Sequence, residues 1–256
     1  MDPQTWRWWT LLRGCSVLNI AAFLATAGVL AGQVSGTQAI QLACAGIYVA
    51  VCAFRSFWPR VDLERVVLVD HPLSSIVLGR TSATIAEMAF TVQCALFVAD
   101  LAVRTQLPFG GVAWVLVPLI AVAQLACWLG VVTLDHRWHA VEETLWGIAM
   151  ALLTGVFGWS LTVLDGGWIG IVGLGLVGSL AGGFVMLALD VPMYVRRARE
   201  ERAAGKPVLS VAMGFSDALV RREPTGSWDV WKHEVAWMTP YFTGCVWLSI
   251  ALVWLS

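Results

Sequence analysis

The residues best suited to chemistry lie in one short stretch, just before a long apolar run. Positions 135–143 read Asp-His-Arg-Trp-His-Ala-Val-Glu-Glu and hold two of the four histidines of the chain. On a helix through this stretch, His136, His139 and Glu143 have i, i+3, i+7 spacing and share one face. Glu142 lies at i+3 from His139 and is also within reach. Imidazole and carboxylate groups at such spacing can transfer protons or share a metal ion.

Further polar residues are predicted to lie at the same depth in other apolar segments. Glu87 is nearly two turns inside such a segment, on a stripe that also carries Thr84 and Thr91. Ionisable residues within apolar spans are costly and usually face the interior of a helix bundle. We therefore predict Glu87, His139 and Glu143 as catalytic residues. The residues that we predict to bind substrate in this layer are Arg55, Arg80, Asp190, Tyr194, Trp237 and Tyr241.

A metal site and a structural ion network are alternative interpretations of these residues. The candidate metal ligands are His136, His139, Glu142, Glu143, His233 and Glu234, with iron or zinc as the metal. The chain has neither a His-Glu-x-x-His motif nor a pair of Glu-x-x-His motifs, so the spacing favours metal only weakly. In the network interpretation, arginines such as Arg55 and Arg80 neutralise the carboxylates and tie helix ends together. The sequence leaves these interpretations open.

The elements that carry these residues are predicted to be membrane-spanning helices. The chain is 59% hydrophobic, and its mean hydropathy is +0.76. Apolar runs of about 20 residues recur, which is the length a helix needs to cross a bilayer. We predict an all-α, polytopic integral membrane protein with a single domain of about seven spans. The predicted spans cover residues 9–30, 38–57, 81–103, 111–134, 141–164, 168–189 and 234–254, with a long loop over 190–233.

The distribution of basic residues predicts the orientation of the spans. Of the 16 lysines and arginines, only Arg104 falls on the side of the short connections. Because basic residues concentrate in cytoplasmic loops, the N-terminus is predicted to be cytoplasmic and the C-terminus outside. The expected location is an inner or plasma membrane. The histidines all fall on the predicted cytoplasmic side, so a site formed by them would open there.

Several residues are predicted to serve structure alone. The stretch Val61–Val69 mixes apolar and charged residues, which predicts a helix along the membrane surface. Ser74 or Ser75 is predicted to cap the third span. The six cysteines fall in apolar runs and are interpreted as small core residues. The Gly178-x-x-x-Gly182 pair of the sixth span allows close helix packing, and this glycine face is a candidate surface for a homo-oligomer.

Together, these features favour an integral-membrane enzyme with a polar cavity on its cytoplasmic side. Its substrate would be a lipid or isoprenoid-like molecule, and its chemistry carboxylate and histidine acid–base catalysis or metal-assisted catalysis. A transporter or ion-coupled carrier is the alternative, followed by a non-enzymatic receptor-like or assembly protein. The last predicted span has no lysine, which argues against a retinal Schiff base. The expected partners are membrane lipids, and no feature indicates nucleic acid.

Overall fold

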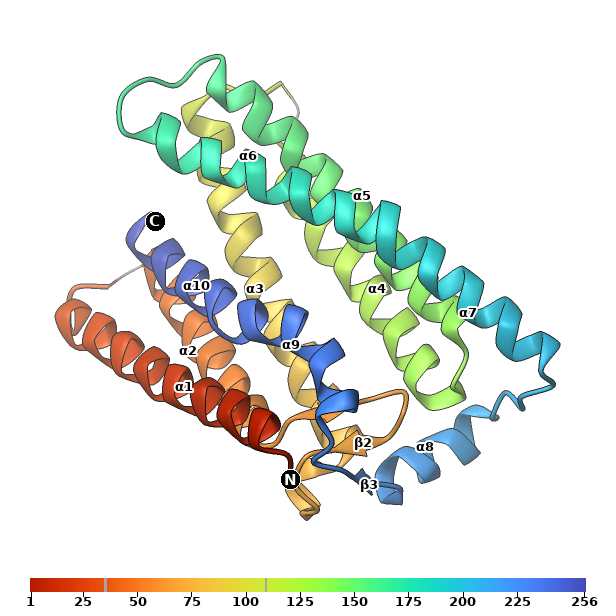
Figure 1. The fold of residues 1–256 in the computed structure, drawn as a ribbon. Helices are drawn as coiled ribbons and strands as arrows, with labels where there is room; N and C mark the ends of the chain where they lie inside the picture. Colours follow the sequence, from red (N-terminus) through yellow and green to blue (C-terminus); the bar gives the residue numbers. More distant parts are fainter. Residues whose placement is uncertain (35, 109) are drawn as a thin grey trace. The chain divides into compact units, whose positions relative to one another are not determined.

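The computed structural model of the chain is built almost entirely of helices (Figure 1). It describes residues 1–34, 36–108 and 110–256. Within these ranges, seven helical segments are long and apolar enough to cross a membrane, as the sequence predicts. The helices are α1 (Pro3–Leu30), α2 (Gly36–Phe57), α3 (Ile76–Arg104), α4 (Val112–Thr133), α5 (His136–Leu161), α6 (Trp168–Phe184), η2 (Val185–Asp190), α7 (Val191–Ala203), α8 (Val211–Val220), α9 (Trp228–Phe242) and α10 (Gly244–Trp254), with a 3₁₀ turn, η1 (Pro72–Ser74), before α3.

Tertiary contacts divide the chain into two compact units. Unit 1 comprises residues 1–93 and 215–256, and unit 2 comprises residues 94–214. In unit 1, α1 and α2 lie side by side, and the C-terminal pair α9 and α10 contacts both of them (Figure 1). The core between these helices is apolar and aromatic, and it includes Trp8, Leu12, Tyr48, Trp231, Phe242 and Ile250. The end of the chain therefore completes the unit that its beginning starts.

In the middle of unit 1, polar residues from three helices are hydrogen-bonded to one another. The Gln93 amide donates to the main-chain oxygens of Gln41 and Ser249, both at 3.0 Å. In return, the Ser249 hydroxyl donates to Gln93 Oε1 at 2.5 Å, and the Gln41 amide donates to the Gln93 carbonyl at 3.0 Å. All three side chains are fully buried. These bonds tie α2, α3 and α10 together at a fixed register.

The connection between α2 and α3 differs from the prediction. The helix predicted over Val61–Val69 is wrong: β1 (Arg60–Val61) and β2 (Val66–Val67) form an antiparallel hairpin, and β3 (Glu223–Pro224) pairs with β2 in parallel. The reason lies in Arg65, which has a φ of 58° in the turn of the hairpin. Its buried guanidinium pairs with Asp217 at 2.9 Å, so Arg65 points into the protein. Helix α3 itself begins at Ile76, directly after Ser75.

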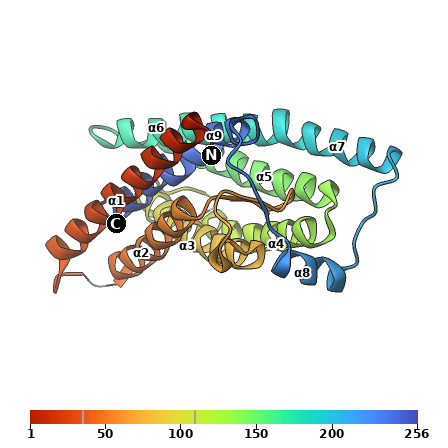
Figure 2. The same cartoon turned by 60° about the horizontal axis from the view of Figure 1, so that its bottom comes forward.

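Unit 2 is organised around α5. Helices α4 and α5 form an antiparallel hairpin, and the α6–η2–α7 segment contacts α5 along another side (Figure 2). The sixth helical segment runs to Ala203, well beyond the predicted end at residue 189. Hydropathy shows only where the apolar sequence ends. The arginines, glutamates and alanines that follow are good helix formers, so the helix continues beyond that point. The predicted loop over 190–233 is therefore partly helical, through α7, α8 and the start of α9.

We predict that Gly214→Ala destabilises unit 2. The Leu209 amide donates to the Thr133 carbonyl at 3.0 Å, which holds the segment before α8 against the end of α4. A Cβ on Gly214 would lie 1.6 Å from the Val132 main-chain oxygen, so the backbone would have to move. We expect a loss of about 1–3 kcal/mol in unfolding free energy, measured as a lower midpoint of thermal unfolding in detergent.

The matched control is Gly155→Ala, because a Cβ at Gly155 on α5 would meet open space. This variant should unfold at or above the wild-type temperature, since alanine favours a helix over glycine by about 0.8–1.0 kcal/mol. Equal midpoints for the two variants would contradict the close contact at Gly214.

Candidate functional site

The turn between α4 and α5 starts α5 at the histidine-rich stretch. Helix α4 ends at Thr133, and Leu134 has a φ of 57°, which reverses the chain. Asp135 then caps α5: its Oδ1 accepts a hydrogen bond from the Arg137 main-chain amide at 3.0 Å. The Arg137 guanidinium also pairs with this carboxylate, and its hydrogen bonds lower the pKa of Asp135 below the ordinary value. His136 and His139 therefore lie in the first turns of a well-capped helix.

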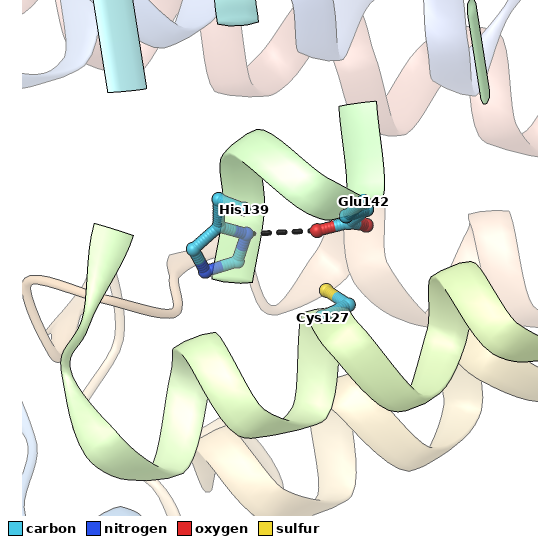
Figure 3. Close-up of side chains that lie close together, drawn as sticks. All are labelled: Cys127, His139 and Glu142. Carbon is cyan, nitrogen blue, oxygen red and sulfur yellow. Dashed lines mark hydrogen bonds and ion pairs between the residues drawn. The ribbon is translucent and has the colours of Figure 1, made fainter. Parts of the chain in front are cut away.

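Three side chains from the α4–α5 hairpin converge into one buried cluster. His139 Nδ1 and Glu142 Oε2 of α5 form a hydrogen bond of 2.8 Å. Cys127 projects from α4 towards this pair (Figure 3). One ligand atom from each of the three residues lies within 4.8 Å of the others. Their exposed fractions are 2% for Cys127, 5% for His139 and 7% for Glu142, so the whole cluster is withdrawn from solvent.

The imidazole of His139 is held tightly on both faces. On the α4 side it lies against Gly130, where an added Cβ would be 2.5 Å from Nε2. On the α7 side the ring of Tyr194 stacks on it, with 5.3 Å between ring centroids. Nε2 is buried and has no hydrogen-bond partner among the residues that the structure describes. Because buried polar atoms are nearly always bonded, this nitrogen calls for an explanation such as a bound ion or water.

A π-helical turn positions Tyr194 over the cluster. Segment η2 widens the helix between α6 and α7, and such turns shift the register of everything that follows. Within it, Leu187 packs on Gly147 of α5, where a Cβ would approach its Cδ2 to 2.4 Å. Tyr194 follows η2 by one turn of α7 and contacts both His136 and His139. Tyr194 therefore lies beside the cluster, and its role in binding substrate stays a prediction.

The other predicted residues of unit 2 surround this cluster without joining it. His136 Nδ1 pairs with Glu201 Oε2 of α7 at 2.6 Å. Glu143 is half-buried and lies within electrostatic range of Tyr194. Asp190 is half-buried at the end of η2. Of the predicted residues in this unit, the structure brings together His139 and Glu142, with Tyr194 alongside.

Cys127 is the residue that sequence reasoning missed. It looked like a small core residue because it lies in the apolar run of α4. The signal that could have found it is its distance from the turn. Cys127 lies as many positions before the end of α4 at Thr133 as Glu142 lies after the start of α5 at His136. In an antiparallel helix hairpin, residues equally far from the turn lie at the same height.

The remaining predicted site residues lie in unit 1. Arg80 Nη2 pairs with Glu87 Oε2 at 3.0 Å, and the Tyr241 hydroxyl donates to Glu87 Oε1 at 3.2 Å. Arg55 is buried and lies within electrostatic range of the Tyr241 hydroxyl. Trp237 is 42% exposed, and its indole donates to Glu234 at 2.6 Å. His233 is exposed as well. Glu87, Arg80, Arg55 and Tyr241 thus form a group of their own, apart from the outward-facing Trp237 and His233.

We predict that the charge and the capping oxygen of Asp135 stabilise the hairpin separately. Asp135→Ala removes both and should cost about 0.5–2 kcal/mol of unfolding free energy, whereas Asp135→Asn keeps a capping oxygen and should cost less. Because folding lowers the Asp135 pKa, its carboxylate stabilises the protein at pH values above the ordinary pKa of about 3.9. This contribution is lost as the pH falls through the lowered pKa of the folded state.

Thermal unfolding of the wild type and both variants between pH 7 and pH values below about 4 measures the effect. The advantage of the wild type over Asp135→Asn should shrink on acidification, while the advantage of Asp135→Asn over Asp135→Ala should persist. A pH-independent gap between the wild type and Asp135→Asn would contradict the ion pair with Arg137.

Similarity to other proteins gives no direct indication of the activity. No family model, no curated protein and no solved structure matches the chain. What the protein does must therefore be inferred from its own residues, of which Cys127, His139 and Glu142 form the most concentrated group of potential ligands.

Proposed function

We propose that this chain is a membrane-embedded metalloenzyme that holds a divalent ion, with zinc as the best fit, at Cys127, His139 and Glu142. The observation that carries the proposal is the convergence of these three buried side chains. Each is a common zinc ligand, as thiolate, imidazole or carboxylate. Of the metals considered from the sequence, iron is favoured less, because the mixed sulfur, nitrogen and oxygen set lacks the two-histidine, one-carboxylate pattern of non-haem iron sites.

Charge balance favours a divalent ion at this position. A thiolate and a carboxylate bring two negative charges, and a neutral imidazole brings none. A dication among them gives a neutral group, which is the arrangement that a buried, weakly polar environment tolerates best. Glu142 and His139 are bonded to each other at 2.8 Å, so both groups lie close enough to share the ion.

The number of ligands favours a catalytic ion over a structural one. Structural zinc sites usually have four protein ligands, whereas catalytic sites have three and keep one position for water or substrate. Zinc held by these residues would supply hydroxide at neutral pH, because it lowers the pKa of bound water to about 7. In this chain, Tyr194 covers the His139 ring and Gly130 leaves room for it. These residues orient the imidazole, and Glu143 and Asp190 are nearby candidates for proton transfer.

The substrate that we propose is lipid-like and approaches from the end of the helices that carries the α4–α5 turn. The apolar length of the helical segments supports insertion in a membrane. The concentration of arginines at this end supports its assignment to the cytoplasmic side. A molecule that reaches a buried centre at this depth is already in the headgroup region, which favours a lipid over a freely soluble substrate.

Transport is less well supported than catalysis. A carrier needs polar groups that lead from one face to the other, and the central polar residues of unit 1 are instead bonded to one another. Gln41 and Gln93 are fully buried and directly bonded across α2 and α3. In the last turns of α3, Asp100 pairs with Arg104 at 2.5 Å. Assembly into a homo-oligomer through the glycines of α6 stays a prediction.

We predict that the detergent-purified protein binds about one zinc ion per chain, measured by mass spectrometry of the metal content. Cys127→Ser and His139→Ala should each lose most of it, because each removes one of three ligands. Replacing zinc with cobalt adds a direct report on the thiolate, since a cysteine-bound cobalt ion has a near-ultraviolet charge-transfer band. That band should vanish in Cys127→Ser.

Cys44→Ser is the matched control, because Cys44 is also a buried cysteine on an apolar helix but belongs to unit 1. It should keep both the metal and the cobalt band. Gly130→Ala tests the same centre without removing a ligand, since the added methyl would displace the His139 ring. A wild type that binds no divalent metal after loading, or equal binding in Cys127→Ser and Cys44→Ser, would overturn the metal centre.

We predict that the loaded protein changes the composition of a polar lipid extract. Wild type and Cys127→Ser are incubated with the extract, and the lipids are compared by mass spectrometry. One substrate and product pair should change with the wild type and stay constant with the variant, because only the wild type keeps all three residues that would hold the ion. Identical lipid profiles with fully loaded wild type would contradict a lipid substrate. The metal centre is tested separately, by the metal-binding measurement.

A further inference from the structure

Unit 1 contains an excess of buried positive charge at the end that carries the β1–β2 hairpin. Arg55 lies in the last turn of α2, Arg60 in β1 and Arg80 in the second turn of α3. Their exposed fractions are only 6%, 1% and 6%. Arginine is seldom buried to this degree unless a negative partner accompanies it. The partners of the three guanidinium groups are therefore informative.

Only Arg80 has a carboxylate in contact among the residues that the structure describes, namely Glu87 at 3.0 Å. Arg55 has no hydrogen bond or ion pair with any residue that the structure describes, and its guanidinium lies over the ring of Phe242 at 5.6 Å. Arg60 donates to two main-chain oxygens, those of Trp58 at 3.2 Å and Ser75 at 2.7 Å.

The nitrogen Nη2 of Arg60 is buried and has no hydrogen-bond partner within the described part of the chain. Asp62 lies within electrostatic range of Arg60. Asp62 and Glu87 together carry one negative charge fewer than the positive charges of the three arginines.

The positive charges of Arg55 and Arg60 also repel each other. Burial, and next the charge of Arg55, lower the pKa of Arg60 to about 10. A lowered pKa of a base means that folding disfavours its charged form, so the fold bears a cost for keeping Arg60 charged at neutral pH. The Arg60 side chain is nevertheless closely packed. A Cβ on Gly79 would lie only 2.4 Å from its Cδ, and its guanidinium lies over the Phe54 ring at 4.9 Å.

We propose that Arg55 and Arg60, flanked by Arg80, bind a phosphate-type oxyanion. A phosphate supplies the missing negative charge and an acceptor for the buried Nη2 nitrogen of Arg60. Guanidinium groups match phosphate oxygens in a planar, two-pronged geometry, which an ammonium group cannot provide. The phosphate can belong to a lipid headgroup or to a small soluble phosphate. This site lies within unit 1 and does not rest on the metal centre of unit 2.

The test measures stabilisation of the purified full-length protein by three probes. These are inorganic phosphate, a short-chain phosphatidic acid, and the diacylglycerol with the same chains but no phosphate. Thermal unfolding is followed by tryptophan fluorescence. A ligand that binds only the folded state raises its stability by mass action. Phosphatidic acid should raise the unfolding midpoint of the wild type in a concentration-dependent way, and diacylglycerol should not.

Inorganic phosphate distinguishes the two sources of the group. A response to phosphatidic acid alone identifies a lipid headgroup, and a response to both identifies the phosphate group itself as sufficient. Both outcomes support the site. No stabilisation by either phosphate probe, or equal stabilisation by diacylglycerol, would overturn it.

Variants separate this site from general charge effects. Arg55→Gln should lose the response to phosphate probes, yet without ligand it should be at least as stable as the wild type, because it removes a poorly balanced buried charge. Arg7→Gln is the matched control, since Arg7 belongs to the same unit but is exposed. It should respond like the wild type. Arg60→Lys keeps the charge but loses the planar fork, so its apparent affinity should fall by about tenfold or more. An undiminished response in both Arg55→Gln and Arg60→Lys would refute the assignment.

Discussion

The cost of burying charge among apolar helices governs the arrangement of both units. In unit 2, His139 and Glu142 are bonded to each other, and in unit 1 Arg65 pairs with Asp217 and Arg80 with Glu87. Each of these pairs links residues that would be prohibitively costly to bury alone. The two proposed sites lie where such pairing is concentrated or insufficient: the proposed cation at the buried group of Cys127, His139 and Glu142, and the proposed anion at Arg55 and Arg60, where the Nη2 nitrogen of Arg60 has no hydrogen-bond partner among the described residues.

The helical architecture could be predicted from the sequence because length and hydropathy alone define a span. Helix ends were less predictable, since the charged residues after Asp190 continue a helix that hydropathy had ended. The bonded pair His139 and Glu142 followed from its i+3 spacing on one helix. Cys127 and Arg60 could not be assigned in this way, because each meets its neighbours through tertiary structure, across a helix hairpin or over the backbone of α3 at Gly79.

Glycines decide how closely the functional side chains approach their helices. Gly130 admits the His139 ring, Gly79 admits the Arg60 side chain, and Gly147 admits Leu187 of the π-helical turn. In each case a glycine on a helix removes the Cβ that would separate a side chain from the backbone. Through the third contact, α5 holds the segment that presents Tyr194, so one helix supplies two residues of the cluster and also positions the aromatic ring above them.

Unit 1 is formed from both ends of the chain, which limits the order in which the two units can fold during synthesis. Gln93 bonds to Ser249, which lies 156 positions later, and Asn19 donates to the carbonyl of Phe242, which lies 223 positions later. At a synthesis rate of ~5–20 residues per second, Gln93 waits on the order of ten seconds or more for that partner. During this interval the nascent unit 1 contains amides without their final acceptors, whereas every residue of unit 2 is made before unit 1 can close. Unit 1 is thus begun first and completed last, and its early helices lack these contacts until α9 and α10 are made.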